Sequence, residues 1–254
     1  MINFGDIYSK YYNLFYQDKN YIGEVKYIHE LIKNYKENAL NILDLGCGTG
    51  KHAVFFCEQG YIVHGIDLSK SMLEIAEQNR LGRENKLSFS QSDIQNLFLN
   101  QKFDVVLSLF HVMSYQNSND ELINAFKVAK NHLVDGGIFI FDFWYGPAVL
   151  TDLPTIRVKR LENDHIKVTR LAEPVIHAQD NIVDVNYSIY IQDQKTQEVI
   201  EKKESHKMRY LFDTELEMIC EQVGLEIVDR FKWMSKEKPS FDSWNVVWIL
   251  KNLK

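Results

Sequence analysis

Over the first 143 positions, segments with the apolar pattern of a strand alternate with segments that have the apolar spacing of a helix. Short apolar runs stand at 41–45, 61–66, 87–91, 103–110 and 138–143, and between them apolar positions recur every three to four residues. The run at 103–110 contains one acidic residue, Asp104, which is typical of a parallel strand covered on both faces. Strands that alternate with helices in this way predict a doubly wound, mostly parallel sheet.

The period changes to two after residue 143. Apolar and polar residues alternate at 166–171, 183–191 and 206–210, which predicts an inserted antiparallel sheet. Helical spacing returns at 214–223, and two final strands at 225–233 and 243–251 are separated by a short loop, so the last strand should be antiparallel. We therefore predict an α/β fold: a seven-stranded, mostly parallel sheet from 1–143 and 213–254, with a small antiparallel β insertion at 144–212.

Composition narrows the function classes. The 254 residues are 45% hydrophobic and 25% charged, as in a soluble globular protein, and no apolar window is long enough to span a membrane. The first ten residues lack a signal layout, which predicts a cytoplasmic protein. The net charge of −6 argues against a globally basic nucleic-acid binder. The three cysteines and the histidines show no metal-ligand spacing, so no metal is expected.

The most informative segment is D-L-G-C-G-T-G at 44–50, between a predicted strand and a predicted helix. Its glycines allow a sharp turn and a close approach to a ligand, but the spacing is not the G-x-G-x-x-G of dinucleotide binding. Asp44 suits an ammonium group better than a pyrophosphate. Asp67, at the end of the second strand, suits ribose hydroxyls, and Asp93 suits an adenine edge. S-adenosylmethionine (SAM) meets all three requirements.

The segments 44–50, 67–72 and 92–94 resemble the successive motifs of class I SAM-dependent methyltransferases. The resemblance implies SAM as cofactor. It implies that the glycines line the methionine and ribose portion, Asp67 holds the ribose, and Asp93 with Ile94 contacts adenine. The expected cofactor residues in this part of the chain are Asp44, Gly46, Cys47, Gly48, Gly50, Asp67, Leu68, Met72, Asp93, Ile94, Leu109 and Phe110.

A narrower resemblance involves the aromatic N-terminus and the insertion. They are similar to small-molecule N-methyltransferases that dimethylate a nucleotide-linked amino sugar. This implies an N-terminal helical lid, with Tyr16 and Tyr21 against the cofactor, and an insertion on the substrate side. O-methylation of a small hydroxyl acceptor and SAM binding without catalysis remain open. A nicotinamide oxidoreductase and a nucleic-acid substrate are disfavoured, no membrane contact is expected, and a homodimer is left open.

Candidate catalytic and substrate residues lie near strand ends, because ligands of open α/β sheets bind at the carboxyl edge. His111 directly follows the fourth strand and Tyr115 comes four residues later; both are candidates for catalysis. Aromatic side chains after the fifth strand could form a wall for the acceptor. Two further candidates on the last insertion strand stand on opposite faces by parity, so we expect at most one of them to face the acceptor. The expected substrate residues are Phe143, Trp144, His206 and Arg209.

Overall fold

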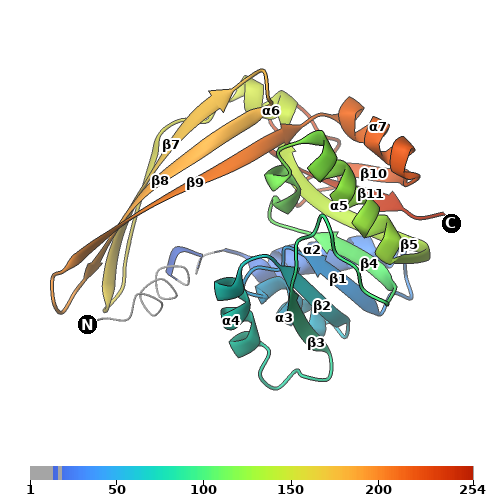
Figure 1. The fold of residues 1–254 in the computed structure, drawn as a ribbon, viewed down its shortest axis with the longest axis horizontal. Helices are drawn as coiled ribbons and strands as arrows, with labels where there is room; N and C mark the ends of the chain where they lie inside the picture. The colour runs from blue at the N-terminus through green and yellow to red at the C-terminus, as the bar shows by residue number, and fades with distance from the viewer. Residues whose placement is uncertain (1–13, 17–18, 254) are drawn as a thin grey trace. The chain divides into compact units, whose positions relative to one another are not determined.

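The computed structural model describes residues 14–16 and 19–253, which divide into two compact units. The larger unit holds residues 21–152 and 209–254, and the smaller holds 153–208 with the N-terminal residues up to 20 (Figure 1). The expected N-terminal lid falls largely outside the described residues, and the part that is described, 14–16, belongs to the smaller unit.

The larger unit alternates strands and helices as the sequence predicts. Its elements are α2 (Tyr21–Tyr35), β1 (Asn41–Leu45), α3 (Lys51–Glu58), β2 (Ile62–Asp67), α4 (Lys70–Asn79), β3 (Leu87–Gln91), β4 (Phe103–Ser108), the 3₁₀ turn η1 (Val112–Tyr115), α5 (Asn119–His132), β5 (Leu133–Tyr145), α6 (Gly146–Thr151), α7 (Asp213–Val223), β10 (Glu226–Lys232) and β11 (Asn245–Lys251).

Strand pairing confirms a mostly parallel sheet with an antiparallel final strand. The order β3-β2-β1-β4-β5 is parallel throughout, β11 pairs antiparallel with β5, and β10 pairs antiparallel with β11. In all, the described residues form a connected set of 11 strands rather than seven. The set is larger because the end of β9 (Val199–Leu211) pairs with β5 at Trp144 and Tyr145, beyond the predicted strand.

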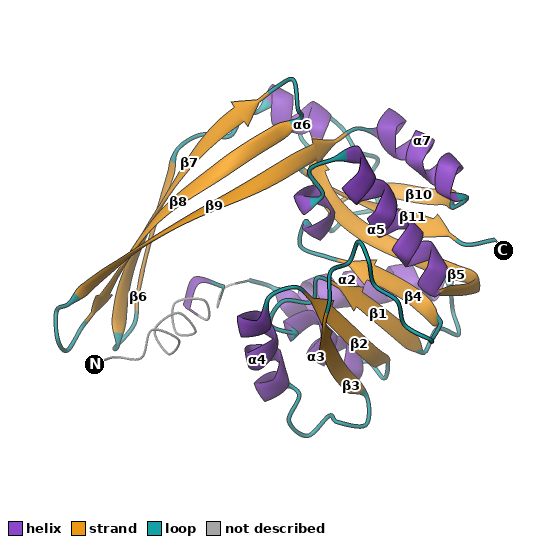
Figure 2. Cartoon of the chain, in the orientation of Figure 1, coloured by secondary structure: helices purple, strands orange, loops and turns teal. Residues whose placement is uncertain are grey.

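Helices cover both faces of the larger unit's sheet (Figure 2). Apolar residues of α2 and α3 pack on one face, with Ile138 and Ile140 of β5. Apolar residues of α5 and α7 pack on the other face, with Phe139 and Phe141 of the same strand. Because successive strand residues face opposite sides, a continuous apolar strand is buried by both layers. Within the described residues, no helix has the length and apolar character to cross a membrane.

The smaller unit is an antiparallel sheet. Strand β6 (Arg157–Glu162) pairs with β7 (Ile166–His177), and β7 pairs with β8 (Ile182–Asp193), both antiparallel, with β9 next in order. This confirms the period-two prediction. One face of the sheet is buried under two N-terminal side chains, Leu14 and Phe15, which pack against Ile166, Val168, Ile189 and Ile191.

Candidate functional site

The glycine loop is fixed to the end of β2 by backbone hydrogen bonds. The amides of Gly46 and Cys47 both donate to the carbonyl oxygen of Ile66, at 2.7 and 2.9 Å, and Gly50 N–H donates to Cys47 at 2.9 Å. The three loop glycines have left-handed backbones, with φ of 79°, 54° and 71°. Side chains rarely adopt this conformation, which explains why the turn uses glycine.

The space around the three glycines differs. A Cβ at Gly46 would lie 2.5 Å from the Val112 side chain, and one at Gly50 would lie 2.5 Å from the Phe89 ring. A Cβ at Gly48 would meet nothing within 4 Å. Gly46 and Gly50 are thus required by packing, whereas Gly48 exposes its backbone to open space that a ligand can occupy.

The Asp67 carboxylate, at the end of β2, fixes the glycine loop by hydrogen bonds to backbone amides. Its Oδ2 accepts from Gly48 N–H and its Oδ1 accepts from Ser69 N–H, both at 2.8 Å. A carboxylate has about four acceptor positions, so two remain for a ligand. This half-buried group, held beside the open Gly48 backbone, fits the expected contact with two ribose hydroxyls.

Asp44 is a buried carboxylate, 3% exposed, on β1. Burial, and then the nearby Asp67, raise its pKa from 3.8 to about 7. Among the described residues it has neither a hydrogen bond nor an ion pair. An unpaired buried charge is unfavourable, and a cationic ammonium at this place would relieve it. The orphaned carboxylate and the open glycine cradle therefore fit the amino-acid portion of SAM.

Some of the other expected cofactor residues have accessible side chains, and others have buried ones. Leu68 is 67% exposed and Met72 is half-buried, so both side chains can reach a ligand. Ile94 and Leu109 point into the core, and Cys47 packs against Leu73 and Ala76, so a ligand would meet the backbone of these three. Burial raises the pKa of the Cys47 thiol well above its usual range. The Asp93 carboxylate accepts from Gln95 N–H at 2.9 Å.

Tyr16 and Tyr21, expected together, lie in different units. Tyr21 begins α2 and packs edge-on against His52 of α3, with ring centroids 4.9 Å apart. His52 Nε2 in turn lies 2.6 Å from Glu24, which fastens the two helix starts beside the glycine loop. Tyr16 lies in the smaller unit, where burial raises its pKa and its hydroxyl contacts Arg170.

The chain leaves β4 through two strained residues. Phe110 and His111 both have left-handed backbones, with φ of 68° and 64°. Each such residue other than glycine costs about 1–3 kcal/mol, and this strain is concentrated at functional sites. Val112, the next residue, lies against Gly46, so this segment borders the glycine loop.

His111 is paired with a carboxylate from the neighbouring strand. Its Nδ1 lies 2.7 Å from Oδ2 of Asp142, and its backbone N–H donates to both Asp142 oxygens at 3.2 Å. Asp142 is 1% exposed, whereas the His111 side chain is partly exposed. The arrangement presents an oriented imidazole, which can accept a proton.

Aromatic residues surround this imidazole. The Trp144 ring lies edge-on to His111 at 6.4 Å and to Trp244 at 5.3 Å, and Trp144 N–H donates to Ser114. Tyr115, in η1, is 43% exposed. The structure thus brings together two of the expected residues, His111 and Trp144, and adds Trp244.

Phe143 does not fit the expected acceptor wall. Its side chain is fully buried and stacks on Phe141 at 5.7 Å, within the core beneath α5 and α7. The expectation was wrong for this residue because neighbouring strand residues face opposite sides, so Phe143 and Trp144 cannot line one wall.

Arg209 and His206 also have other partners. The buried Arg209 guanidinium donates to Asn119 at 2.6 Å and to Glu215 at 3.2 Å, and so joins the starts of α5 and α7. Arg209 thus has a structural role, and its binding of an acceptor anion stays a prediction. His206 lies in the smaller unit, 3.4 Å from Glu204 and edge-on to Tyr187.

The sequence alone did not identify Asp142 and Trp244 as residues of the candidate site. Asp142 is the acid in an otherwise apolar strand, 138–143, and that exception was its available signal. Its pairing with His111 depends on β4 and β5 being adjacent, which the periodicity does not state. Trp244 lies in the loop before β11, 100 residues after its partner Trp144, and no local sequence pattern distinguishes it.

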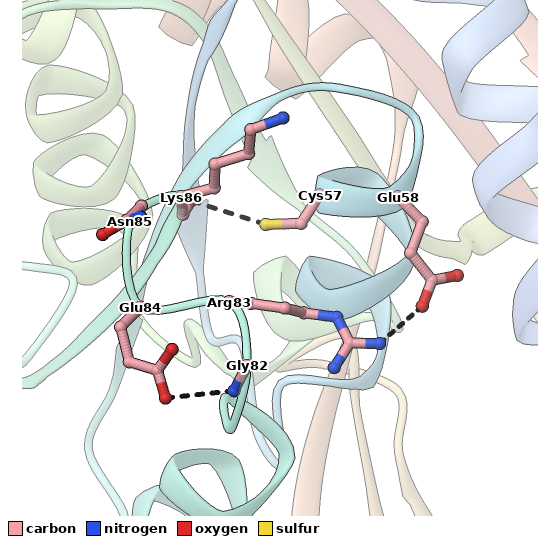
Figure 3. A pocket seen from close by; sticks show the side chains of 7 residues that line it. All are labelled: Cys57, Glu58, Gly82, Arg83, Glu84, Asn85 and Lys86. Atoms are coloured by element: carbon pink, nitrogen blue, oxygen red, sulfur yellow. Dashed lines mark hydrogen bonds and ion pairs between the residues drawn. The ribbon is translucent and has the colours of Figure 1, made fainter.

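A separate cavity of about 320 Å³ lies where α3 ends and β3 begins (Figure 3). Arg83 pairs with Glu58 at 2.7 Å across it, Gly82 N–H donates to Glu84 at 3.0 Å, and the Cys57 thiol donates to Lys86 at 3.4 Å. Because these polar groups are satisfied by one another, we assign it no ligand.

Comparison with known proteins yields consistent similarities. A family model described as a methyltransferase domain matches residues 42–137. The dTDP-3-amino-3,4,6-trideoxy-alpha-D-glucopyranose N,N-dimethyltransferase of Streptomyces venezuelae is 27% identical over 70% of this chain and 74% of its own length. The dTDP-3-amino-3,6-dideoxy-alpha-D-glucopyranose N,N-dimethyltransferase of Streptomyces fradiae is 23% identical over 86% and 84%.

A solved structure shares the whole fold. The crystal structure of a SAM-dependent methyltransferase from Clostridium acetobutylicum is 25% identical, with a TM-score of 0.82 over 98% of this chain and 99% of that chain. The family match includes the glycine loop, Asp67, Asp93 and His111, and it ends before Asp142.

Proposed function

Because the chain is a class I SAM-dependent methyltransferase that resembles small-molecule N-methyltransferases of amino-sugar type, we propose that it methylates an amine. The acceptor class we propose is the amino group of a nucleotide-linked amino sugar. Two relatives named as N,N-dimethyltransferases of such sugars, similar over most of the chain, support this choice.

The observation that carries the proposal is the His111–Asp142 pair beside the glycine loop. A primary amine is largely protonated near neutral pH and cannot attack until it loses a proton. His111 is a base for that proton, and Val112 against Gly46 puts the segment next to the cofactor cradle. Ligands of such sheets bind at this carboxyl edge.

When bound, SAM would supply an electrophilic methyl group and a neutral thioether leaving group. Asp44 would hold its ammonium and Asp67 its ribose hydroxyls, beside the glycine loop. His111 Nε2 would take the proton from the acceptor ammonium and leave a neutral amine as the nucleophile. Trp144 and Trp244 would exclude water and help to align that amine.

The test uses matched acceptors. Purified protein is incubated with isotopically methyl-labelled SAM and two nucleotide-linked sugars that differ only in an amino or hydroxyl group at one carbon. Mass spectrometry should show label on the amino sugar alone. His111→Ala should lower kcat roughly 10²–10⁴-fold with near-normal SAM affinity. Transfer to the hydroxyl sugar in place of the amino sugar would instead identify an O-methyltransferase.

A further inference from the structure

Asp142 is a buried carboxylate with an unusual set of partners. Both oxygens accept from the backbone N–H of His111 at 3.2 Å, and Oδ2 also lies 2.7 Å from its Nδ1. Within the described residues, Asp142 forms no ion pair with a lysine or an arginine. The backbone and the side chain of one residue therefore provide its recorded polar contacts, at the point where β4 ends in two left-handed residues.

We propose that Asp142 is the positioning residue of the reaction: it holds the left-handed backbone at His111 and keeps the imidazole proton on Nδ1, which leaves Nε2 as the proton acceptor. The proposal rests on the proposed function of His111 as the base. It assigns to Asp142 a role in orientation, without contact to the acceptor.

The tautomer follows from the 2.7 Å contact between His111 Nδ1 and Asp142 Oδ2, which has the distance of an ion pair without the angle of a hydrogen bond. A carboxylate oxygen carries only lone pairs, so an unprotonated Nδ1 at this distance would be repelled, and the proton therefore lies on Nδ1. A neutral imidazole has one N–H, so Nε2 keeps its lone pair. After Nε2 has taken a proton from the acceptor, the negative charge of Asp142 also stabilises the imidazolium that results.

Asp142→Ala is a sharp test because it removes both oxygens that face His111. Without this carboxylate nothing holds the proton on Nδ1, and an imidazole in ordinary polar surroundings favours the tautomer protonated at Nε2, so the base is lost. Asp142→Asn is the conservative variant. Its two side-chain positions are equally far from the His111 N–H, so its amide oxygen can stand opposite Nδ1 and keep the proton there.

The tautomer can be read directly by ¹⁵N NMR of histidine-labelled protein bound to S-adenosylhomocysteine. We expect a protonated Nδ1 in wild type and in Asp142→Asn, and a mostly protonated Nε2 in Asp142→Ala. In Asp142→Ala we also expect kcat on the amino acceptor to fall roughly 10²–10⁴-fold, with the affinity for S-adenosylhomocysteine kept within about threefold. Asp229→Ala on β10, whose carboxylate binds Tyr35 and Lys238, is the matched control and should keep the wild-type tautomer and kcat.

A double-mutant cycle separates positioning from a general structural effect. In a His111→Ala background, Asp142→Ala should lower kcat by less than about threefold, since the residue it positions is gone. Losses that multiply, or an Asp142→Ala protein that keeps the Nδ1 proton, would overturn the proposal. The NMR result needs no acceptor, so it stands or falls independently of whether amino sugars prove to be the substrates.

Discussion

At the residue scale, two carboxylates define the cofactor side of the site, and their surroundings give them different tasks. Asp67 already accepts two backbone N–H groups and is half-buried, so it can add hydroxyl donors at little cost. Asp44 is buried without a partner among the described residues, so it needs a cation. Each environment yields a separate prediction.

Asp67→Ala should weaken SAM binding by about 1.5–3 kcal/mol, the scale of hydrogen bonds to a charged group. It should also lower stability, because Gly48 and Ser69 lose an acceptor. Asp104→Ala is the matched control: Asp104 accepts from Leu40 N–H and Asn41 N–H at 2.9 Å. Titration calorimetry should show an affinity loss in the first variant alone; equal affinities would reject the ribose assignment.

The raised pKa of Asp44 predicts a pH dependence of stability. Between its ordinary value, 3.8, and about 7, the unfolded chain loses the proton while the folded chain keeps it. Stability of the ligand-free protein is therefore highest below this window and falls as pH rises through it, by on the order of 2–4 kcal/mol. Asp44→Asn should remove this fall in urea denaturation at pH 5 and pH 8.

The same group predicts a pH dependence of binding. The ionised Asp44 attracts an ammonium, so SAM affinity should rise with pH up to about 7, approaching tenfold per pH unit. Calorimetry in buffers of different ionisation enthalpy should detect proton release on binding. In Asp44→Asn the affinity should be lower and nearly independent of pH, and an unchanged profile would contradict the ammonium assignment.

At the element scale, the junction between β1 and α3 combines a strand end, a left-handed turn and a helix start. Gly50 precedes α3 with φ of 71°, and the free N–H groups of the helix's first turn lie directly behind the loop. Two of its three glycines are fixed by packing against Val112 and Phe89. The third, Gly48, is where the element is open to a ligand.

Gly48→Ala should therefore separate binding from stability. The left-handed backbone should cost about 1 kcal/mol of stability, because no atom within 4 Å obstructs the methyl group. The methyl group would occupy the cradle, so SAM affinity should fall at least about tenfold, as 1.4 kcal/mol is a factor of ten. Gly82→Ala, with φ of 81° and equally open surroundings, should cost similar stability and leave affinity unchanged.

At the scale of the whole molecule, the chain forms its smaller unit from two distant segments. Phe15 is buried in that unit, with the Arg170 guanidinium 3.5 Å and Lys159 Nζ 4.4 Å from its ring centroid. Cations over an aromatic face are attracted to it, and the ring also covers apolar strand residues. Residues 14 and 15 are therefore part of the insertion's core.

Phe15→Ala should destabilise the smaller unit by about 3–5 kcal/mol, the usual effect of removing a buried ring. Hydrogen exchange measured by mass spectrometry should accelerate in β7 and β8 and remain unchanged in β1 and β4. Phe98→Ala, at a ring that is 85% exposed in the larger unit, should change neither. Uniform acceleration throughout the chain would show that the two units unfold as one.

The sequence by itself determined the features that depend on local spacing. Periods of two and of three to four residues follow from strand and helix geometry, so the parallel sheet, the antiparallel insertion and the final antiparallel strand could be predicted. The glycine loop and the acids at 44, 67 and 93 could be found because a motif lies within a few residues of its strand end.

Only the tertiary structure decided which distant residues meet. The pairing of His111 with Asp142 depends on β4 and β5 being adjacent, and Trp244 reaches Trp144 through β11 beside β5. Phe143 lies in the core because its side chain faces the helix layer that covers that side of the sheet. Arg209 donates hydrogen bonds to the first turns of two helices, α5 and α7. The contacts of His111 with Asp142, Arg209 with Asn119 and Trp144 with Trp244 join residues 31, 90 and 100 positions apart, beyond the reach of any local pattern.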